Sequence, residues 1–253
     1  MKKILPAMLL SMFLLSAITV SAMAQLTPGV EVGDWFKYEA HVTEWTSADP
    51  FLPEGYQGPL TLADNETNYI LYTVADITSG DGGDNVTFDI TYDWINGTTT
   101  YGTLVENVST SNTGIFVIGA NMTAGDMVSD EWNLLGFFDY PARYINETFA
   151  LNANGTDRDT NSLEYAVDIF GSVYNYTYWW DKTTGIRVYY AQQGDLAEFG
   201  GNPAYTYAAY WSLIDSSVDG LIVPDLTGPI LFLAIMSIST PIALLCRRKK
   251  LFN

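Results

Sequence analysis

The clearest pattern along the chain is an alternation of apolar and polar residues over positions 85–94. The apolar positions are Val86, Phe88, Ile90, Tyr92 and Trp94. A period of two predicts a β-strand with one buried face and one wet face. Asn96-Gly97 follows directly and favours a two-residue type I′ turn, in which both central residues need positive φ. This turn predicts a hairpin that pairs Tyr92 with Tyr101, Ile90 with Thr103 and Phe88 with Val105.

Shorter apolar patterns predict further strands. They cover 34–45, 68–78, 114–120, 143–151, 163–170, 174–180, 186–191 and 204–214. The strand at 68–78 is apolar on both faces, so both faces should be covered. Residues 181–185 should form a hairpin turn with Gly185 in the left-handed region. The Pro- and Gly-rich stretch 46–61 should be an irregular loop.

One short helix is predicted, starting at Ser129. A hydroxyl cap, two acids and apolar residues at Trp132, Leu135 and Phe138 favour it. Strands do not alternate with long helices, which argues against a parallel α/β fold. The expected fold is mainly β: a large curved antiparallel sheet of nine or ten strands with one short helix. A half-barrel and a sandwich are both compatible with the pattern.

The two ends of the chain predict export and membrane anchoring. Lys2 and Lys3, an apolar run over 4–20 and a small-residue site before Gln25 form a signal peptide cleaved after Ala24. Residues 226–246 hold no charge and would form a helix about 31 Å long, enough to span a bilayer. The basic residues 247–250 should stay cytoplasmic. The expected segments are a signal peptide at 1–24, an extracellular β-rich domain at 25–215, a tether at 216–225, a transmembrane helix at 226–246 and a cytoplasmic tail at 247–253.

Charge and cysteine content narrow the class of protein. All 29 acidic residues lie between Glu31 and Asp225, where only five basic residues occur, giving a formal charge of −24. Such a surface repels phosphates, so no nucleic-acid partner is expected. The basic residues of this part are Lys37, Arg143, Arg158, Lys182 and Arg187. The single Cys246 falls in the membrane segment, so the exported domain has no disulfide and must be stabilised by packing.

Asn-x-Ser/Thr sequons are the one dense motif. Eight occur, all in the exported part, and they predict N-glycosylation. The sites are Asn65, Asn85, Asn96, Asn107, Asn121, Asn146, Asn154 and Asn175. The alternative is that an Asn- and Thr-rich β-protein contains sequons by accident.

Residue types give little support for catalysis. His41 is the only histidine and is expected on the first strand as a half-exposed residue, so no catalytic or cofactor-binding residues are assigned and the protein is not expected to be an enzyme. No Cys/His metal spacing exists. Asp157, Asp159 and Asn161 are spaced like the start of a calcium loop, although its glycine and distal glutamate are absent. Polar turn chemistry is the alternative explanation.

Two aromatic stretches could line a ligand cavity or fill a core, and the sequence leaves both open. One comprises Tyr174, Tyr176, Tyr178 and Trp180, and the other Tyr205, Tyr207 and Trp211.

Three stretches together resemble archaeal cell-surface proteins with a signal peptide, a β-rich ectodomain and a C-terminal membrane segment, a family without an established activity. They are residues 29–38, residues 180–188 and the tail from 223. The tail is also similar to sorting signals recognised by a membrane-embedded transpeptidase, although Pro224-Asp225 departs from their usual motif. The 181–185 hairpin is similar to one in the lipoprotein-carrier (LolA/LppX-like) fold, a half-barrel that holds a lipid.

The expected function is that of a membrane-anchored, glycosylated, acidic cell-surface domain with a structural or binding role. One alternative is a carrier or sensor of a lipid or other hydrophobic ligand, and another is a surface hydrolase using carboxylates. The expected partners are the membrane, through the C-terminal helix, and either surface-layer proteins or a hydrophobic ligand.

Overall fold

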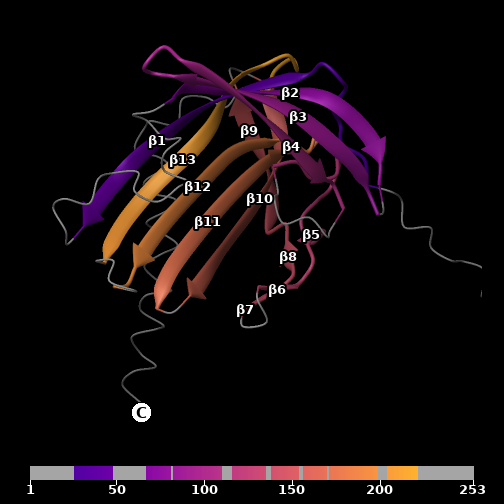
Figure 1. Ribbon diagram of the computed structural model, residues 1–253. Coiled ribbons are helices and arrows are strands. Elements are labelled where there is room, and N and C mark those ends of the chain that lie inside the picture. The colour runs from indigo at the N-terminus through magenta and orange to yellow at the C-terminus, as the bar shows by residue number, and fades with distance from the viewer. Residues whose placement is uncertain are drawn as a thin grey trace, which may run out of the picture.

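A single antiparallel sheet of nine strands organises the computed structural model, which describes residues 26–47, 67–80, 82–109, 116–134, 138–153, 156–169, 171–198 and 204–221 (Figure 1). The strand order is β4-β3-β2-β1-β13-β12-β11-β10-β9. The strands are β1 (Trp35–Ser47), β2 (Thr67–Ser79), β3 (Asp84–Trp94), β4 (Thr99–Asn107), β9 (Glu147–Ala153), β10 (Thr156–Ile169), β11 (Ser172–Asp181), β12 (Arg187–Leu196) and β13 (Tyr205–Ser216). The prediction of a large curved antiparallel sheet is confirmed, and the described sheet is single rather than one half of a sandwich.

The sheet consists of two runs of consecutive strands joined by its first and last members. Strands β1 to β4 pair in sequence, as do β9 to β13. The β1–β13 pairing, from Phe36 opposite Ser216 to Ser47 opposite Tyr205, unites the two runs. The centre of the sheet therefore forms only when the two ends of the domain meet.

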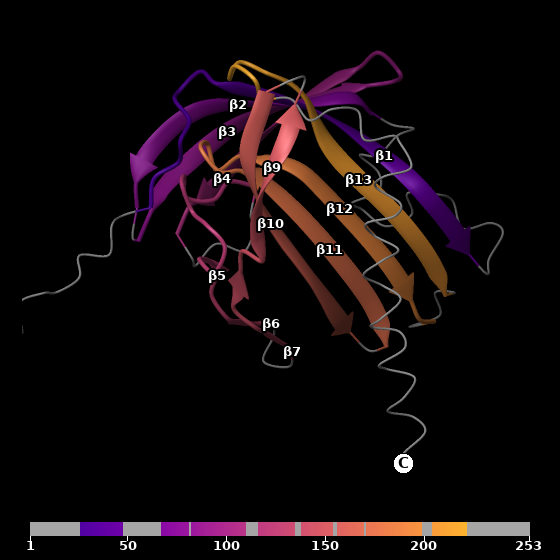
Figure 2. The ribbon, with the colours of Figure 1, turned by 180° about the vertical axis from the view of Figure 1, so that it is seen from behind.

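Curvature arises beside this central pair. Strands β1 and β2 share only four paired positions, ending at Tyr38 opposite Ile70. The β1–β13 register shifts at the same place, between Lys37 and Tyr38, and such bulges bend strands. Beyond this point β2, β3 and β4 turn away and cross the ends of the other strands (Figures 1 and 2). The sheet thereby acquires an inner face, on which the two halves face one another.

The segment between β4 and β9 lies against part of this inner face (Figure 2). It contains two small two-stranded sheets: β5 (Met127–Ser129) pairs with β8 (Arg143–Tyr144), and β6 (Trp132–Leu134) and β7 (Phe138–Tyr140), which lie between them in the chain, form a hairpin. Its start is fixed by the buried carboxylate of Glu106, whose Oε2 accepts the backbone N–H groups of Phe116 (2.7 Å) and Val117 (3.0 Å). We call residues 116–145 the inner segment.

The predicted 181–185 turn holds the inner segment on the sheet. Gly185 has φ +75°, as expected, and a Cβ there would lie 2.0 Å from the carbonyl oxygen of Ile118. The N–H of Ile118 donates to the carbonyl of Gly185 (2.9 Å), and that of Arg187 donates to the carbonyl of Phe116 (3.0 Å). Glycine is needed here for both conformation and space.

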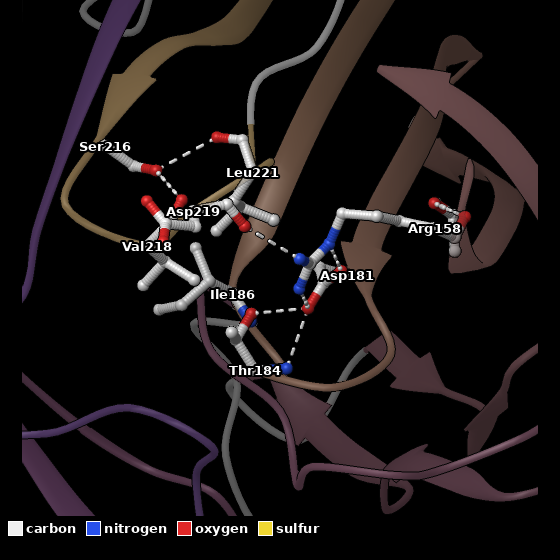
Figure 3. Close-up of polar contacts among 9 residues, drawn as sticks. Arg158, Asp181, Thr184, Ile186, Ser216, Val218, Asp219 and Leu221 are labelled. Carbon is white, nitrogen blue, oxygen red and sulfur yellow. Dashed lines mark hydrogen bonds and ion pairs between the residues drawn. The ribbon is translucent and has the colours of Figure 1, made fainter. Parts of the chain in front are cut away.

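On the outer face, a polar latch ties the end of the domain to the same hairpin (Figure 3). The guanidinium of Arg158 donates to both carboxylate oxygens of Asp181, from Nε (2.7 Å) and Nη2 (3.1 Å), and from Nη1 to the carbonyl of Asp219 (3.0 Å). Asp181 also accepts from the backbone N–H and the hydroxyl of Thr184. The hydroxyl of Ser216 donates to the carbonyls of Val218 and Leu221. The first residues of the predicted tether thus pack on the domain.

The predicted helix at Ser129 is wrong. Residues 127–134 form short strands instead, and the described part of the chain contains no helix. The backbone is extended and paired: Met127 lies opposite Tyr144, and Trp132 lies opposite Tyr140. A two-turn helix has little stability of its own, so packing against the sheet decides the conformation.

The predicted hairpin register after β3 is also wrong, by one residue. Tyr92 lies opposite Thr100, Ile90 opposite Gly102 and Phe88 opposite Leu104. Gly97 has φ +81° while Asn96 has no positive φ, and the Trp94 N–H donates to the carbonyl of Thr98. The loop therefore has three residues with glycine at its left-handed end, a geometry known as a G1 bulge. The shift exchanges the faces of β4, so that Tyr101 is 79% exposed.

Other predictions hold in part. The two-sided strand is β2, but Tyr69 and Leu71 on its outer face are only half-buried. The strand predicted at 114–120 is reduced, in its described residues, to the bridge between Val117 and Ile186. The signal peptide with its Ala24/Gln25 cleavage site, the 46–61 loop beyond Ser47 and the segments beyond 221 lie outside the described residues. Within those residues, no helix is long and apolar enough to cross a membrane.

Candidate ligand-binding face

Tyrosine and tryptophan rings cover much of the inner face, and those of Tyr165, Tyr176, Tyr178 and Tyr190 belong to a cluster that the inner segment helps to form. Tyr178 pairs across strands with Tyr190, and Tyr190 with Trp211. The ring centroids are 4.8 Å apart in the first pair and 5.0 Å in the second, and Tyr165 lies 6.1 Å from Tyr178. The two aromatic stretches noted in the sequence thus join into one surface. We call Tyr165, Tyr174, Tyr176, Tyr178, Tyr190, Tyr205, Tyr207 and Trp211 the aromatic platform.

A glycine in mid-strand makes room for this platform. Gly194 lies opposite Tyr174 on one side and Tyr207 on the other. A Cβ at Gly194 would lie 2.3 Å from the Tyr207 ring. Glycine inside a strand weakens it, and its presence there often marks a place where another group approaches the backbone closely. Here the approaching group is the Tyr207 ring, which lies over the backbone of β12.

The hydroxyl groups of the platform share a poorly hydrated environment. Burial raises the pKa of Tyr178, Tyr190 and Tyr207 well above the ordinary value, and neighbouring tyrosines raise it further. The Tyr190 hydroxyl donates to Oε1 of Gln192 (3.0 Å). All these phenols are neutral at physiological pH, so the platform presents rings and hydroxyl groups without charge.

Arg187 lies at the boundary between the platform and the inner segment. Its guanidinium carbon is 4.9 Å from the ring centroids of both Phe116 and Tyr190. Its Nε is buried without a hydrogen-bond partner, and its side chain forms no hydrogen bond or ion pair with any described residue. Its backbone carbonyl accepts the hydroxyl of Tyr38. A guanidinium carries five N–H donors, so a partly buried one without an acceptor is costly.

Arg143 occupies the other side of the platform and is 8% exposed. It donates to the hydroxyl of Tyr165 (2.7 Å) and weakly to that of Ser129 (3.4 Å), while its Nε is also buried without a partner. Its guanidinium carbon lies 4.8 Å from the Tyr165 ring centroid. A pocket of about 240 Å³ adjoins it, lined by Leu163, Tyr165, Val167 and residues 141–144 among others. No described carboxylate pairs with Arg143.

The hydrophobic clusters differ in what packs on the sheet. In two of them, residues of the inner segment such as Phe116, Ile118 and Ile145 pack against the strands. The third cluster contains side chains of β1, β2, β3, β4, β12 and β13 and no described residue from outside the sheet. We call it the sheet-only cluster: Ala40, Ile70, Ile90, Tyr205, Tyr207, Ala209 and Trp211, with Val42, Trp45, Tyr72, Tyr92, Leu104, Tyr190 and Leu196 beside it.

The three calcium candidates lie along strand β10 and not in a loop. Asp157 accepts from the amide of Asn152 (2.6 Å), and Asp159 lies 3.3 Å from Nζ of Lys182. The buried Asn161 bonds to the Thr148 hydroxyl and the Met122 carbonyl. Each has a protein partner, and the described residues hold no group of three or more His, Cys, Asp or Glu residues suited to a metal. The calcium site stays a prediction.

The sequons fall into two structural groups. The amide nitrogen of Asn107 donates to Gly83 and Asn85, so that atom is engaged within the protein. Asn96, Asn121, Asn146 and Asn175 are exposed, and none of their amide nitrogens donates to a described residue. Asn65 and Asn154 lie outside the described residues. Glycosylation stays a prediction, most favourable at the four exposed sites.

The sequence did not identify the two inner-face arginines as functional residues. His41 is half-exposed on β1 as expected, 3.3 Å from Glu39, and its ring is tilted against that of Tyr210 with centroids 5.1 Å apart. Arg143 and Arg187 were noted only as two of the five basic residues between Glu31 and Asp225. Alternation alone would place Arg187 on the same face as Tyr189, and a register shift between Trp179 and Trp180 brings Arg187 opposite Trp180 on the inner face, so the sequence contained no signal for it.

Comparison with known proteins gives little information. No protein-family profile and no curated protein sequence matches the chain. Among solved structures, a Bacteroides fragilis protein predicted to be exported and described as having a YmcC-like fold is similar. Its TM-score is 0.40 at 14% identity, over 77% of this chain and 100% of that one. Similarity at this level carries no argument about function.

Proposed function

We propose that this protein is an exported, membrane-held binding domain whose inner aromatic face accommodates a hydrophobic ligand. The sheet-only cluster carries the proposal, because its rings pack against no described residue from outside the sheet, although Tyr205, Tyr207 and Trp211 are only 5%, 4% and 7% exposed. Concave, mainly apolar surfaces with a few convergent polar groups are the usual form of ligand sites. The ligand is held rather than transformed, so no residue is assigned a catalytic role.

The composition of the face supports binding over simple core packing. Tyrosine presents a large apolar ring together with a hydroxyl group, a combination enriched where one end of a residue is apolar and the other is wet. Seven tyrosines belong to the platform, and the hydroxyl of one of them, Tyr190, donates to Gln192. A core built for stability alone would favour residues without polar atoms.

The remaining parts of the proposal concern location. The basic-flanked apolar segment at 226–246 would hold the domain at the outer side of the membrane, and the exposed sequons would carry glycans. In this arrangement the latch at Arg158 lies near the point where the domain joins its membrane segment. A purely structural surface role is the second candidate, favoured by the extensive packing of the inner segment on the rest of the inner face.

A pair of substitutions separates binding from a structural role. Ala209 belongs to the sheet-only cluster, whereas the adjacent Ala208 faces the other side of β13. The full chain in lipid nanodiscs is irradiated with diazirine-tagged dodecanol, and labelled peptides are identified by mass spectrometry. We expect labelling of β11 to β13 peptides, abolished in Ala209→Trp and retained in Ala208→Trp. Equal labelling of the two variants, or none above that of outer-face peptides, contradicts the proposal.

Native material offers an independent measurement. Protein purified from its own cells should carry a hydrophobic molecule detectable by native mass spectrometry, released on unfolding. The same spectra report glycan mass and cleavage of the C-terminal tail.

A further inference from the structure

Resting on the proposed function, we infer that the ligand is an anionic amphiphile and that Arg187 binds its acid group. The geometry points to a carboxylate or phosphate monoester entering beside Phe116 and Tyr190, with its apolar chain along the aromatic platform. If the inner face binds no ligand, this inference fails. If Arg187 binds no acid group, the proposed ligand site can still exist.

The first step is that Arg187 has donors to satisfy. No described acceptor pairs with its side chain, although 29 carboxylates are present in the exported part. The buried carboxylate of this region, Glu106, is engaged by two backbone N–H groups of the inner segment. Both Glu106 and Arg187 influence the pKa of Tyr72, in opposite directions, but they form no ion pair.

The second step is that an anion suits this position. Arginine binds carboxylates and phosphates with two parallel N–H···O bonds, and such charge-assisted bonds are stronger where water is scarce. The rings of Phe116 and Tyr190 hold the guanidinium by cation–π contact, which orients it without using its donors. The site is therefore preorganised for an acceptor.

The third step concerns direction. Arg187 begins β12, next to the packed end, while Tyr190, Gln192 and Gly194 follow along the inner face toward Tyr207. An amphiphile with its acid group at Arg187 would place its chain over Tyr190, Trp211 and Tyr207. Arg143, across Tyr165 and Tyr178, adds a second positive charge that favours an anion over a neutral ligand.

The test compares matched probes on the full chain in nanodiscs: diazirine-tagged dodecanoate and diazirine-tagged dodecanol. In the unmodified protein both should label the inner face, with dodecanoate preferred. In Arg187→Gln, dodecanoate labelling should fall about tenfold or more, the loss expected for a charge-assisted hydrogen bond, while dodecanol labelling stays unchanged. Arg187→Lys should keep more than half of the dodecanoate labelling. Competition by untagged dodecyl phosphate or dodecanoate then distinguishes the two acid groups.

Dodecanoate and dodecanol labelling are compared within the same variant. Partial unfolding lowers both labels, so their ratio is insensitive to it. If Arg187→Gln lowers both labels equally, or neither, the assignment of Arg187 is overturned and the proposed function stands. If dodecanol also fails to label the inner face of the unmodified protein, the proposed function falls as well. Should Arg187→Gln not fold, a dodecanoate-to-dodecanol ratio in Arg187→Lys equal to that of free partitioning overturns the inference.

Discussion

The two ends of the inner face are built from similar residues but are packed differently. At one end Phe116 stacks on Tyr72, with centroids 4.3 Å apart, and lies edge-on to Phe88 at 5.1 Å. At the other end Trp45, Tyr205 and Tyr207 pack on one another within the sheet. The first is a core with two layers, whereas in the second no described residue from outside the sheet packs on the rings, and Tyr205 and Tyr207 are 5% and 4% exposed.

The arginines differ in the same way. Arg158 on the outer face gives every described donor contact to Asp181 or Asp219, and the hydrogen bond to Asp181 raises its pKa. The guanidinium of Arg187, across the same hairpin, makes cation–π contacts and no hydrogen bond with any of the described residues. Because cations are few in this chain, we interpret the paired Arg158 as a structural residue and the unpaired Arg187 as a residue that binds an external anion. Four predictions test this contrast.

The largest effect is expected in the packed end. Phe116 is 2% exposed, so Phe116→Ala should lower the free energy of unfolding by about 3–5 kcal/mol through lost burial and a cavity. Trp45 is half-buried at the rim of the sheet-only cluster. Trp45→Ala should therefore lower the free energy of unfolding clearly less, because the ring makes fewer contacts that are lost. Urea unfolding of both variants measures the difference. Equal costs would mean that the two ends are packed alike.

The next effect compares the arginines directly. Arg158→Met leaves the buried Asp181 carboxylate without its cation and should cost about 3 kcal/mol. Arg187→Met removes no hydrogen bond and places an apolar chain among rings, so its cost should stay below about 1 kcal/mol. Chemical denaturation at neutral pH gives both values. A cost for Arg187→Met as large as that for Arg158→Met would show that Arg187 has a structural partner.

Tyrosine hydroxyls give a third, pH-dependent test. Burial raises the folded-state pKa of Tyr189 above its ordinary value near 10, and this hydroxyl is buried without a partner. The unfolded chain releases the proton first, so stability present below pH 10 is lost above it by about 1.4 kcal/mol per pH unit for each such group.

Tyr189→Phe should therefore be neutral or stabilising by up to about 1 kcal/mol at pH 7 and should flatten the alkaline loss. Tyr38→Phe, which removes a donor to the Arg187 carbonyl, should be destabilising by a similar amount at pH 7. Urea unfolding between pH 7 and 11 tests both. The same sign for both variants at pH 7 would contradict the assignment of paired and unpaired hydroxyls.

The smallest effect checks the hairpin register. Tyr101→Ser should change stability by less than about 0.5 kcal/mol, since its side chain is 79% exposed. Leu104→Ser on the inner face should cost about 1–2 kcal/mol, because Leu104 packs with Phe88 and its neighbours. If Tyr101→Ser cost more stability than Leu104→Ser, the register of the two-residue turn predicted from the sequence would be correct instead.

Much of the fold could be predicted because it depends on local patterns. Alternation located β3, glycine at position 185 fixed the β11–β12 turn, and the absence of long helical patterns indicated an antiparallel sheet. The register after Trp94 could not be predicted, because Asn-Gly fits both two- and three-residue loops and a shift of one residue exchanges the faces of β4. The Ser129 helix failed because a few residues of helical pattern cannot outweigh packing on a sheet.

The sequence by itself determined the charge, most strands of the large sheet, the absence of cysteine between residues 25 and 225 and the pattern that predicts export and anchoring. Only the tertiary structure decided that β1 meets β13, that the sheet bends where β1 and β2 part, and that Arg187 faces rings while Arg158 faces a carboxylate. The physical reason is range. Strand and turn preferences act over a few neighbouring residues, whereas a charge's partners come from strands far apart in sequence.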